Sequence, residues 1–336
     1  MIERLFIPSF ETQTGYTIDL TVTYQLFGPP LGTAPIVLVI HALTGNSSVT
    51  GPQGWWNTLI GTDQTIDTNN YTIIAIDIPG NGHDRNSENL IIEYKEFHNR
   101  DIAIIQLKIL EKLRITSLYA AIGSSLGGQI LWELAALAPG LIEHLIPIAT
   151  DWKATDWVIA QCSIQDQILH NSAQPIHDAR MHAMTFYRTA ASFTAKFNRS
   201  VHPEKGIYNV KSWLLHHGER LEERFELSTY KLMNHLLGSA SITEGRAEIH
   251  ELLKTIKSTV HLVGIDSDGL FYPDAIQDTH ELLKSAGVTS YYHEIHSIHG
   301  HDAFLIEYEQ LSKILKTIFK NKIQDENSKI WGKIAG

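Results

Sequence analysis

The feature that most constrains the fold of this chain is a Gly-x-Ser-x-Gly motif, in which Gly123, Ser125 and Gly127 hold the three fixed positions. An apolar run with strand character, residues 118–122, precedes it. A run with helical character, residues 129–136, follows it. A strand, a tight turn and a helix in this order put the serine in a strained turn whose close neighbours must be small. The motif therefore predicts a serine hydroxyl that projects above a sheet.

Strand-like and helix-like segments alternate along most of the chain. The middle strands are almost continuously apolar, as expected for parallel strands that are covered on both faces. This alternation predicts an α/β fold with a mostly parallel, doubly wound sheet and right-handed crossovers. The expected strands are residues 18–24, 35–41, 71–77, 118–122, 144–149 and 260–265, and the clearest helices are 103–113 and 275–285.

The strand signal disappears between residues 152 and 241, where the apolar spacing becomes helical. We expect this segment to be a helical lid inserted between two halves of one core, residues 1–151 and 242–321. The polar, lysine-rich residues 322–336 are expected to form a separate C-terminal tail with no evident chemistry.

Composition excludes several classes of protein. A formal net charge of −10 and the lack of a Lys/Arg-rich stripe argue against nucleic acid as a partner. The single cysteine, Cys162, permits no intrachain disulfide, and its apolar, helix-like setting indicates a buried structural thiol. No apolar run approaches the ~20 residues that span a bilayer, and the N-terminus lacks the features of a signal peptide. We therefore expect a cytoplasmic protein without membrane contact.

A serine hydroxyl becomes nucleophilic only when a base takes its proton, and that base needs an orienting acid. Downstream of Ser125, the chain offers Asp268 just after an apolar strand and His301 between a strand and a helix. Loops at the carboxyl ends of strands are where open α/β sheets place catalytic groups. Asp266 follows the same strand and remains a competing acid. Ser, Asp and His in this order match the triads of α/β-hydrolases.

A tetrahedral intermediate also requires backbone N–H donors aimed at its oxygen. We expect one donor at Leu126, the residue after the serine. We expect the other at Leu43, in the loop His41-Ala-Leu-Thr-Gly45 that follows the strand at 35–41. Gly45 allows that loop to turn sharply.

The 18 histidines require that a metal site be considered. The ligand spacings His-Glu-x-x-His and Cys-x-x-Cys are absent, and so are the phosphate-binding and dinucleotide-binding glycine motifs. We therefore expect no metal and no bound cofactor. The histidines closest together in sequence are His216 and His217, and His293, His296, His299 and His301.

Five motifs together resemble the homoserine O-acetyltransferases, a branch of the α/β-hydrolase fold. The resemblance extends from about residue 35 to residue 310, and the chain is similar to the shorter bacterial members. The motifs are the loop at 41–45, Gly54-Trp-Trp-Asn-Thr-Leu-Ile-Gly61, the serine motif, Ala179-Arg-Met-His-Ala-Met-Thr-Phe-Tyr-Arg188 and Gly300-His-Asp-Ala-Phe-Leu305.

The resemblance implies that Ser125 accepts the acyl group, with His301 as base and Asp268 as orienting acid. It implies ping-pong transfer of an acetyl group from acetyl-CoA, as co-substrate, to the hydroxyl of L-homoserine in methionine biosynthesis. It also implies a homodimer with the lid as the contact. A serine esterase or thioesterase of the same fold, with water as acceptor, is the alternative.

The resemblance further implies that Arg180 binds the carboxylate of the acceptor and that Asp302 holds its amino group. A guanidinium matches a carboxylate and a carboxylate matches an ammonium, so the pair would read an amino acid. Arg188 is the alternative ligand for the carboxylate. An esterase has no need of such a clamp.

The chain departs from the family at two places. Ser124 replaces the second glycine of the usual Gly-Gly-Ser, although a serine is still small. Where typical members have a stretch rich in Gly-Cys-x-Gly-Ser, this chain reads Asp77-Ile-Pro-Gly-Asn-Gly-His-Asp-Arg85. Succinyl-CoA as donor therefore stays open. Serine as acceptor also stays open, since one methylene changes binding by only about 1–3 kcal/mol.

Overall fold

The computed structural model describes residues 1–319, so the expected tail at 322–336 and residues 320–321 lie outside the described part. Its centre is an eight-stranded sheet in the order β1-β2-β6-β3-β7-β8-β9-β10. Every pairing from β6 to β10 is parallel, whereas β2 pairs antiparallel with β1 and β6. The strands are β1 (Glu3–Glu11), β2 (Thr17–Phe27), β3 (Ile36–Ile40), β6 (Thr72–Ile76), β7 (Leu118–Ser124), β8 (Ile142–Ile148), β9 (Thr259–Ile265) and β10 (Ser290–Ile295), with a separate short pair β4 (Ile60–Gly61) and β5 (Ile66–Asp67).

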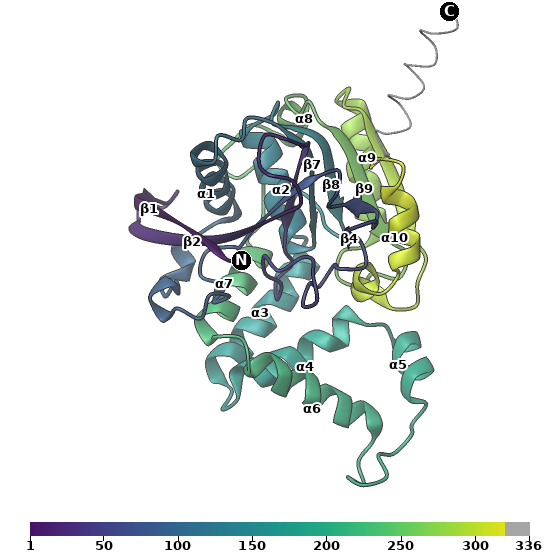
Figure 1. The fold of residues 1–336 in the computed structure, drawn as a ribbon. Coiled ribbons are helices and arrows are strands. Elements are labelled where there is room, and N and C mark those ends of the chain that lie inside the picture. Colours follow the sequence, from purple (N-terminus) through teal and green to yellow (C-terminus); the bar gives the residue numbers. More distant parts are fainter. Residues whose placement is uncertain (320–336) are drawn as a thin grey trace, which may run out of the picture.

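Helices cover both faces of this sheet, so the predicted mostly parallel, doubly wound architecture is confirmed (Figure 1). Alternate residues of β3 divide between two hydrophobic clusters: Leu38 and Ile40 face one, Val37 and Val39 the other. The first cluster includes side chains of α1, α2, α8 and α9, and the second includes those of α10. The helices of the core are α1 (Asn99–Lys112), α2 (Leu126–Leu137), α8 (Ile249–Leu253), α9 (Pro273–Ser285) and α10 (Tyr308–Leu315), with 3-10 turns η1 (Ser87–Asn89), η2 (Tyr94–Glu96) and η3 (Gly300–Leu305).

The sequence pattern did not predict β1. This edge strand pairs with β2, but its register shifts between Ile7 and Phe10, where Ser9 has a φ of 47°. The irregularity breaks the two-residue alternation by which a half-buried strand is recognised. A local bulge therefore hid a strand that the tertiary structure nevertheless forms.

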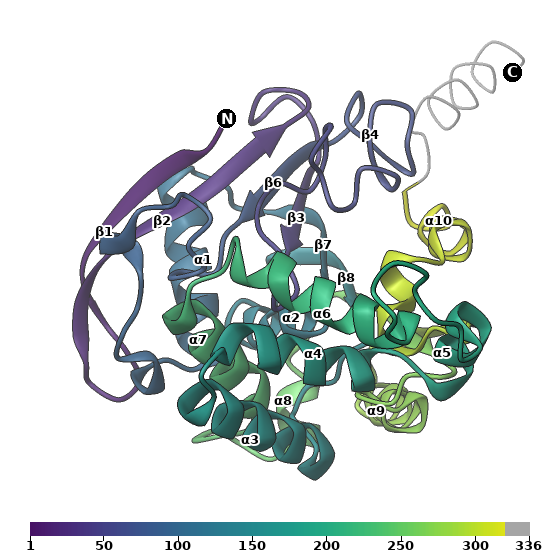
Figure 2. The same cartoon turned by 90° about the horizontal axis from the view of Figure 1, so that it is seen from below.

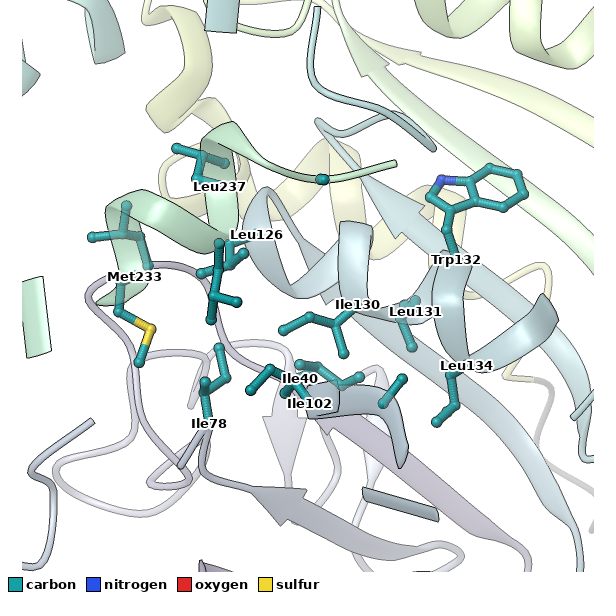
Figure 3. Close-up of a cluster of buried hydrophobic side chains, with 14 of the residues drawn as sticks. Ile40, Ile78, Ile102, Leu126, Ile130, Leu131, Trp132, Leu134, Met233 and Leu237 are labelled. Carbon is teal, nitrogen blue, oxygen red and sulfur yellow. The ribbon is translucent and has the colours of Figure 1, made fainter. Parts of the chain in front are cut away.

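The segment from α3 to α7, between β8 and α8, forms a group of helices at one end of the sheet (Figures 1 and 2). We call residues 152–241 the lid. Its helices are not a separate layer, because Met233 and Leu237 of α7 pack beside Leu126 at the start of α2 (Figure 3). The main core cluster thus continues into the lid. The lid helices are α3 (Asp156–Asn171), α4 (Pro175–Tyr187), α5 (Ala190–Phe197), α6 (Asn209–Glu222) and α7 (Leu227–Gly238).

None of the helices within residues 1–319 combines the length and the apolar character that crossing a membrane requires.

Candidate active site

The Gly-x-Ser-x-Gly motif forms the sharp turn that its composition predicts. Ser125 lies between the end of β7 and the start of α2, with φ 53° and ψ −124°, a conformation that few residues other than glycine adopt. A Cβ on Gly123 would come within 2.7 Å of the carbonyl group of Gly127, and one on Gly127 would collide with the carbonyl oxygen of Ile40. The glycines are therefore required because the helix starts directly against neighbouring strands.

Ser124 stands where the resemblance leads us to expect a second glycine. It is fully buried as the last residue of β7, and its hydroxyl has no hydrogen-bond partner within residues 1–319. A glycine is needed instead at position 128, where a Cβ would collide with the side chain of Thr150.

The turn brings Ser125 to the end of a chain of hydrogen bonds. Its Oγ lies 2.9 Å from Nε2 of His301, and Nδ1 of His301 lies 2.7 Å from Oδ2 of Asp268. The backbone N–H groups of Leu270 and Phe271 donate to the other oxygen of Asp268, at 2.8 and 3.0 Å. Because Oδ2 accepts from Nδ1, Nε2 of the neutral imidazole is free to accept the proton of the serine.

The second acid after β9 points elsewhere. Asp266 Oδ2 lies 3.1 Å from Nδ1 of His296, and its Oδ1 accepts a hydrogen bond from the N–H of Ser297. Of the two candidates that the sequence left open, the structure brings Asp268, and not Asp266, to His301.

Three aromatic rings surround the imidazole of His301. Tyr187 and Phe271 lie 5.6 Å from it between ring centroids, and Phe304 packs edge-on at 5.5 Å. The sequence reasoning did not assign a role to these rings, although Phe304 belongs to the motif that contains His301. They exclude water from the imidazole and strengthen the electrostatic interactions around it.

The lid contacts the two loops that carry His301 and Asp268. Gly300 adopts a φ of 66°, and a Cβ there would lie 2.9 Å from the carbonyl oxygen of Tyr187 at the end of α4. In the other loop, the carbonyl oxygen of Gly269 accepts a hydrogen bond of 2.6 Å from the indole of Trp157 in α3. The lid is therefore part of the wall of the site.

The two expected backbone donors are unoccupied. The described residues include no acceptor for the N–H of Leu43 or of Leu126. Both residues are buried, and Leu43 lies in the tight turn closed by a 2.9 Å hydrogen bond from Gly45 N–H to the carbonyl of Ala42. An oxyanion requires free N–H groups of this kind, and Leu126 directly follows the nucleophile in the chain.

Two arginines and one aspartate meet next to His301. Arg188 Nε lies 3.3 Å from Oδ2 of Asp302. Arg180 comes from α4, stacks 5.6 Å above the ring of Tyr187, and has a buried Nε without a hydrogen-bond partner in the described part of the chain. Burial raises the pKa of Asp302, while the positive charges of Arg180 and Arg188 oppose that rise. The sequence did not foresee the ion pair between Arg188 and Asp302.

No group of three or more His, Cys, Asp or Glu side chains in residues 1–319 could hold a metal ion. Cys162 is buried in α3, and burial raises the pKa of its thiol to about 12, which makes it unreactive.

Comparison with known proteins decides the family. The model of the α/β-hydrolase fold matches residues 35–305. The homoserine O-acetyltransferase of Moorella thermoacetica is 30% identical over 90% of this chain and 91% of its own. This chain belongs to the homoserine O-acetyltransferase family. The homoserine O-acetyltransferase of Salinibacter ruber is 29% identical over 94% of this chain and 97% of its own length.

Solved structures agree on the α/β-hydrolase fold. The homoserine O-acetyltransferase from Bacillus anthracis superimposes with a TM-score of 0.86 over 96% of this chain and 98% of its own, at 19% identity. An acetylester hydrolase from Corynebacterium glutamicum gives 0.78 over 96% of each chain, also at 19% identity. The homoserine O-acetyltransferase family therefore shares its fold with hydrolases, so the choice of acceptor depends on the residues of the site.

Proposed function

We propose that this chain transfers the acetyl group of acetyl-CoA to the side-chain hydroxyl of L-homoserine, through an acyl-enzyme on Ser125. The product, O-acetylhomoserine, belongs to methionine biosynthesis. The observation that carries the proposal is the continuous hydrogen-bonded chain from Ser125 through His301 to Asp268. Family membership supports the same reaction.

In the first half-reaction, Ser125 Oγ attacks the thioester carbonyl while Nε2 of His301 takes its proton. The negative oxygen of the tetrahedral intermediate accepts hydrogen bonds from the free N–H groups of Leu43 and Leu126. When the intermediate collapses, the proton on His301 passes to the departing thiol. The carboxylate of Asp268 stabilises the transient imidazolium and keeps the ring oriented.

In the second half-reaction, the homoserine hydroxyl loses its proton to His301 and its oxygen attacks the carbonyl of the acyl-enzyme. The ester bond to Ser125 then breaks, and His301 returns the proton to Oγ of Ser125. We propose that Arg180 binds the carboxylate of homoserine and that Asp302 binds its ammonium group. The buried Nε of Arg180 has no hydrogen-bond partner in the described residues, and such a donor is costly until a ligand satisfies it. Nε and Nη1 of Arg188 also lack one, but Arg188 lies beside Asp302, so Arg180 is the arginine without a carboxylate of its own. Transfer between a thioester and an alcohol changes no oxidation state, so we propose no cofactor beyond the acyl-CoA co-substrate.

Hydrolysis is the competing function. A serine esterase uses the same three groups, but two arginines around Asp302 serve no purpose when water is the acceptor. The test follows thiol release from acetyl-CoA with and without homoserine. With homoserine we expect fast, continuous release of thiol. Without homoserine we expect release to stop after a single turnover. Equal release without an amino acid would exclude the transferase.

The same assay separates the remaining substrates. Succinyl-CoA in place of acetyl-CoA tests the donor, and serine in place of homoserine tests the acceptor. We expect acetyl-CoA with homoserine to give the highest kcat/KM. A higher value with succinyl-CoA would change the proposed donor while leaving the mechanism intact.

We further propose a cytoplasmic homodimer in which lids contact each other. Large apolar side chains in the lid support this, since they remain substantially exposed in the single chain. Light scattering should give twice the chain mass, and a monomeric mass would contradict the dimer. The exposed lid residues are Trp157, Ile159, Ile164, Val201 and Tyr208.

A further inference from the structure

A second polar cluster lies behind the loop that carries Leu43, at the start of the stretch 77–85 where this chain departs from its family. Its centre is Asp77, which directly follows β6 and is 1% exposed. One carboxylate oxygen accepts from the N–H of Ser47 at 2.7 Å and from the amide of Asn81 at 2.8 Å. The other accepts from Thr23 Oγ1 at 2.7 Å and Ser47 Oγ at 2.8 Å, and lies 3.1 Å from His83 Nδ1.

The same cluster holds the other end of the loop. Nε2 of the buried His41 accepts a 3.0 Å hydrogen bond from the N–H of Ile78 and lies 3.3 Å from the amide nitrogen of Asn81. Nδ1 must then carry the proton, and it donates to the carbonyl of Ala42 at 2.8 Å. Burial lowers the pKa of His41, which keeps this neutral arrangement. The loop is thus anchored at His41 and, six residues later, at Ser47.

Between these two anchors the backbone has little freedom. The turn from Ala42 to Gly45 is closed by one hydrogen bond, and a Cβ on Gly45 would lie only 2.8 Å from the Cβ of His41. Leu43 occupies this turn, and its N–H is one of the two free donors proposed for the oxyanion. The direction of that N–H is therefore set by the anchors, and both anchors depend on the segment that begins at Asp77.

We propose that Asp77 is a positioning residue for catalysis, whose carboxylate fixes the loop that aims the Leu43 N–H at the oxyanion. This proposal rests on the proposed acyl-enzyme mechanism, because it requires that an oxyanion form at Ser125. Asp77 itself touches no substrate. It acts through Ser47 directly and through Asn81 on His41.

The ionised carboxylate suits this role because it accepts several hydrogen bonds at once. Burial alone would favour the neutral acid, but the contact with His83 and the hydrogen bond from Thr23 oppose it, and the pKa of Asp77 is lowered. An asparagine has the same shape but directs an NH2 group toward donors, so it cannot accept from all of them. Asp77→Asn therefore loosens the loop while leaving the volume of the site unchanged.

The test uses the burst of p-nitrophenol from p-nitrophenyl acetate, which reports acylation of Ser125 and requires neither CoA nor homoserine. We expect Asp77→Asn to slow acylation about 10- to 100-fold with the KM for the ester within about threefold, since a misaligned oxyanion donor acts on the transition state. Deacylation should slow by a similar factor. Circular dichroism and the unfolding midpoint establish that the variant is folded at the assay temperature.

The matched control is Thr23→Val, which removes one hydrogen bond to the same carboxylate without touching Ser47 or Asn81. We expect its acylation rate to stay within about twofold of the unmodified protein. If Thr23→Val slowed acylation as much as Asp77→Asn, or if Asp77→Asn changed only the KM, the positioning role would be overturned. Unmodified protein that gives the burst but never acetylates homoserine would refute the proposed acceptor and leave this inference intact.

Discussion

The molecule contains two clusters in which a serine, a histidine and an aspartate are linked. In one, Ser125 lies 2.9 Å from His301, which lies 2.7 Å from Asp268. In the other, Ser48 Oγ lies 3.3 Å from Nε2 of His83, and Nδ1 of His83 lies 3.1 Å from Oδ2 of Asp77. Residue types and order of contact are the same, so contact alone does not make a nucleophile.

The surroundings of the two serines differ in ways that matter chemically. Ser125 occupies a strained turn at the start of a helix, and His301 is the one hydrogen-bond partner of its hydroxyl within residues 1–319. Ser48 lies in an irregular loop, and its hydroxyl already accepts a 2.8 Å hydrogen bond from the amide of Gln25. A nucleophile in acyl transfer also requires free backbone N–H donors for the oxyanion, and the proposed donors Leu43 and Leu126 belong to the first cluster.

The largest effect should come from replacing Ser125, and the matched control is the replacement of Ser48. Ser125→Ala should lower kcat at least about 10⁴-fold, because no other group can form the acyl-enzyme. Ser48→Ala should leave kcat within about threefold. Thiol release from acetyl-CoA in the presence of homoserine measures both. Full activity in the first variant, or inactivity in the second, would reverse the comparison.

The next largest difference in kcat should separate variants of Asp268 and Asp266, the two acids that follow β9. Asp268→Asn should lower kcat about 10³- to 10⁴-fold, because an amide favours the wrong imidazole tautomer at His301. Asp266→Asn is the matched control, since its contacts to His296 and Ser297 lie outside the hydrogen-bonded chain. Its kcat should change less than threefold. Comparable losses in both variants would show that the distance from acid to histidine does not decide their roles.

A smaller effect should separate acylation from transfer. Arg180→Ala should lower kcat/KM for homoserine about 10- to 100-fold through a raised KM, since a charge-assisted hydrogen bond contributes about 1.5–3 kcal/mol. The burst of acyl-enzyme formation should be unchanged, because the triad does not depend on Arg180. An unaltered homoserine KM would argue against the clamp and in favour of Arg188 as the carboxylate ligand.

The smallest effect concerns the pH dependence of stability and His261, which lies among other histidines, whereas His301 lies beside a carboxylate. His261 on β9 lies 3.2 Å from Nδ1 of His144 and stacks on Tyr291 and His293; Glu143 lies 3.8 Å from His144. Burial first, and then the neighbouring His144 and His293, lower the pKa of His261 to about 4.

Because its folded pKa lies below the ordinary 6.5, the unfolded chain binds this proton first as the pH falls. Stability present at pH 7 is therefore lost between about pH 6.5 and 4. His261→Gln should reduce the loss of unfolding free energy between pH 7 and pH 5 by about 1–2 kcal/mol, measured by urea unfolding. A pH dependence identical to that of the unmodified protein would contradict the lowered pKa.

Much of the site could be predicted because its signals are local. The serine turn follows from three glycines between a strand and a helix, and the loop of Leu43 follows from a glycine after a buried strand. Asp266 and Asp268 could not be separated in this way, because both follow β9 and only the turn after it decides which side chain faces His301. The hydrogen bonds from Leu270 and Phe271 make that choice.

The cluster around Asp77 was missed for a different reason. A buried carboxylate at the end of an apolar strand must find partners, and this signal was present in the sequence. Its partners come from Thr23, Ser47 and His83, which are far apart along the chain or in a loop without periodicity. The ion pair between Arg188 and Asp302 is likewise formed across the boundary between lid and core.

The sequence by itself determined the doubly wound sheet, the strained serine and the order of the catalytic groups, because these depend on sterics and hydrophobic periodicity within short segments. The tertiary structure decided which acid meets His301, which N–H groups remain free, and which of two Ser-His-Asp clusters has the geometry of a nucleophile. Those choices depend on directions fixed by strands and loops distant in sequence, and no local pattern encodes a direction in space.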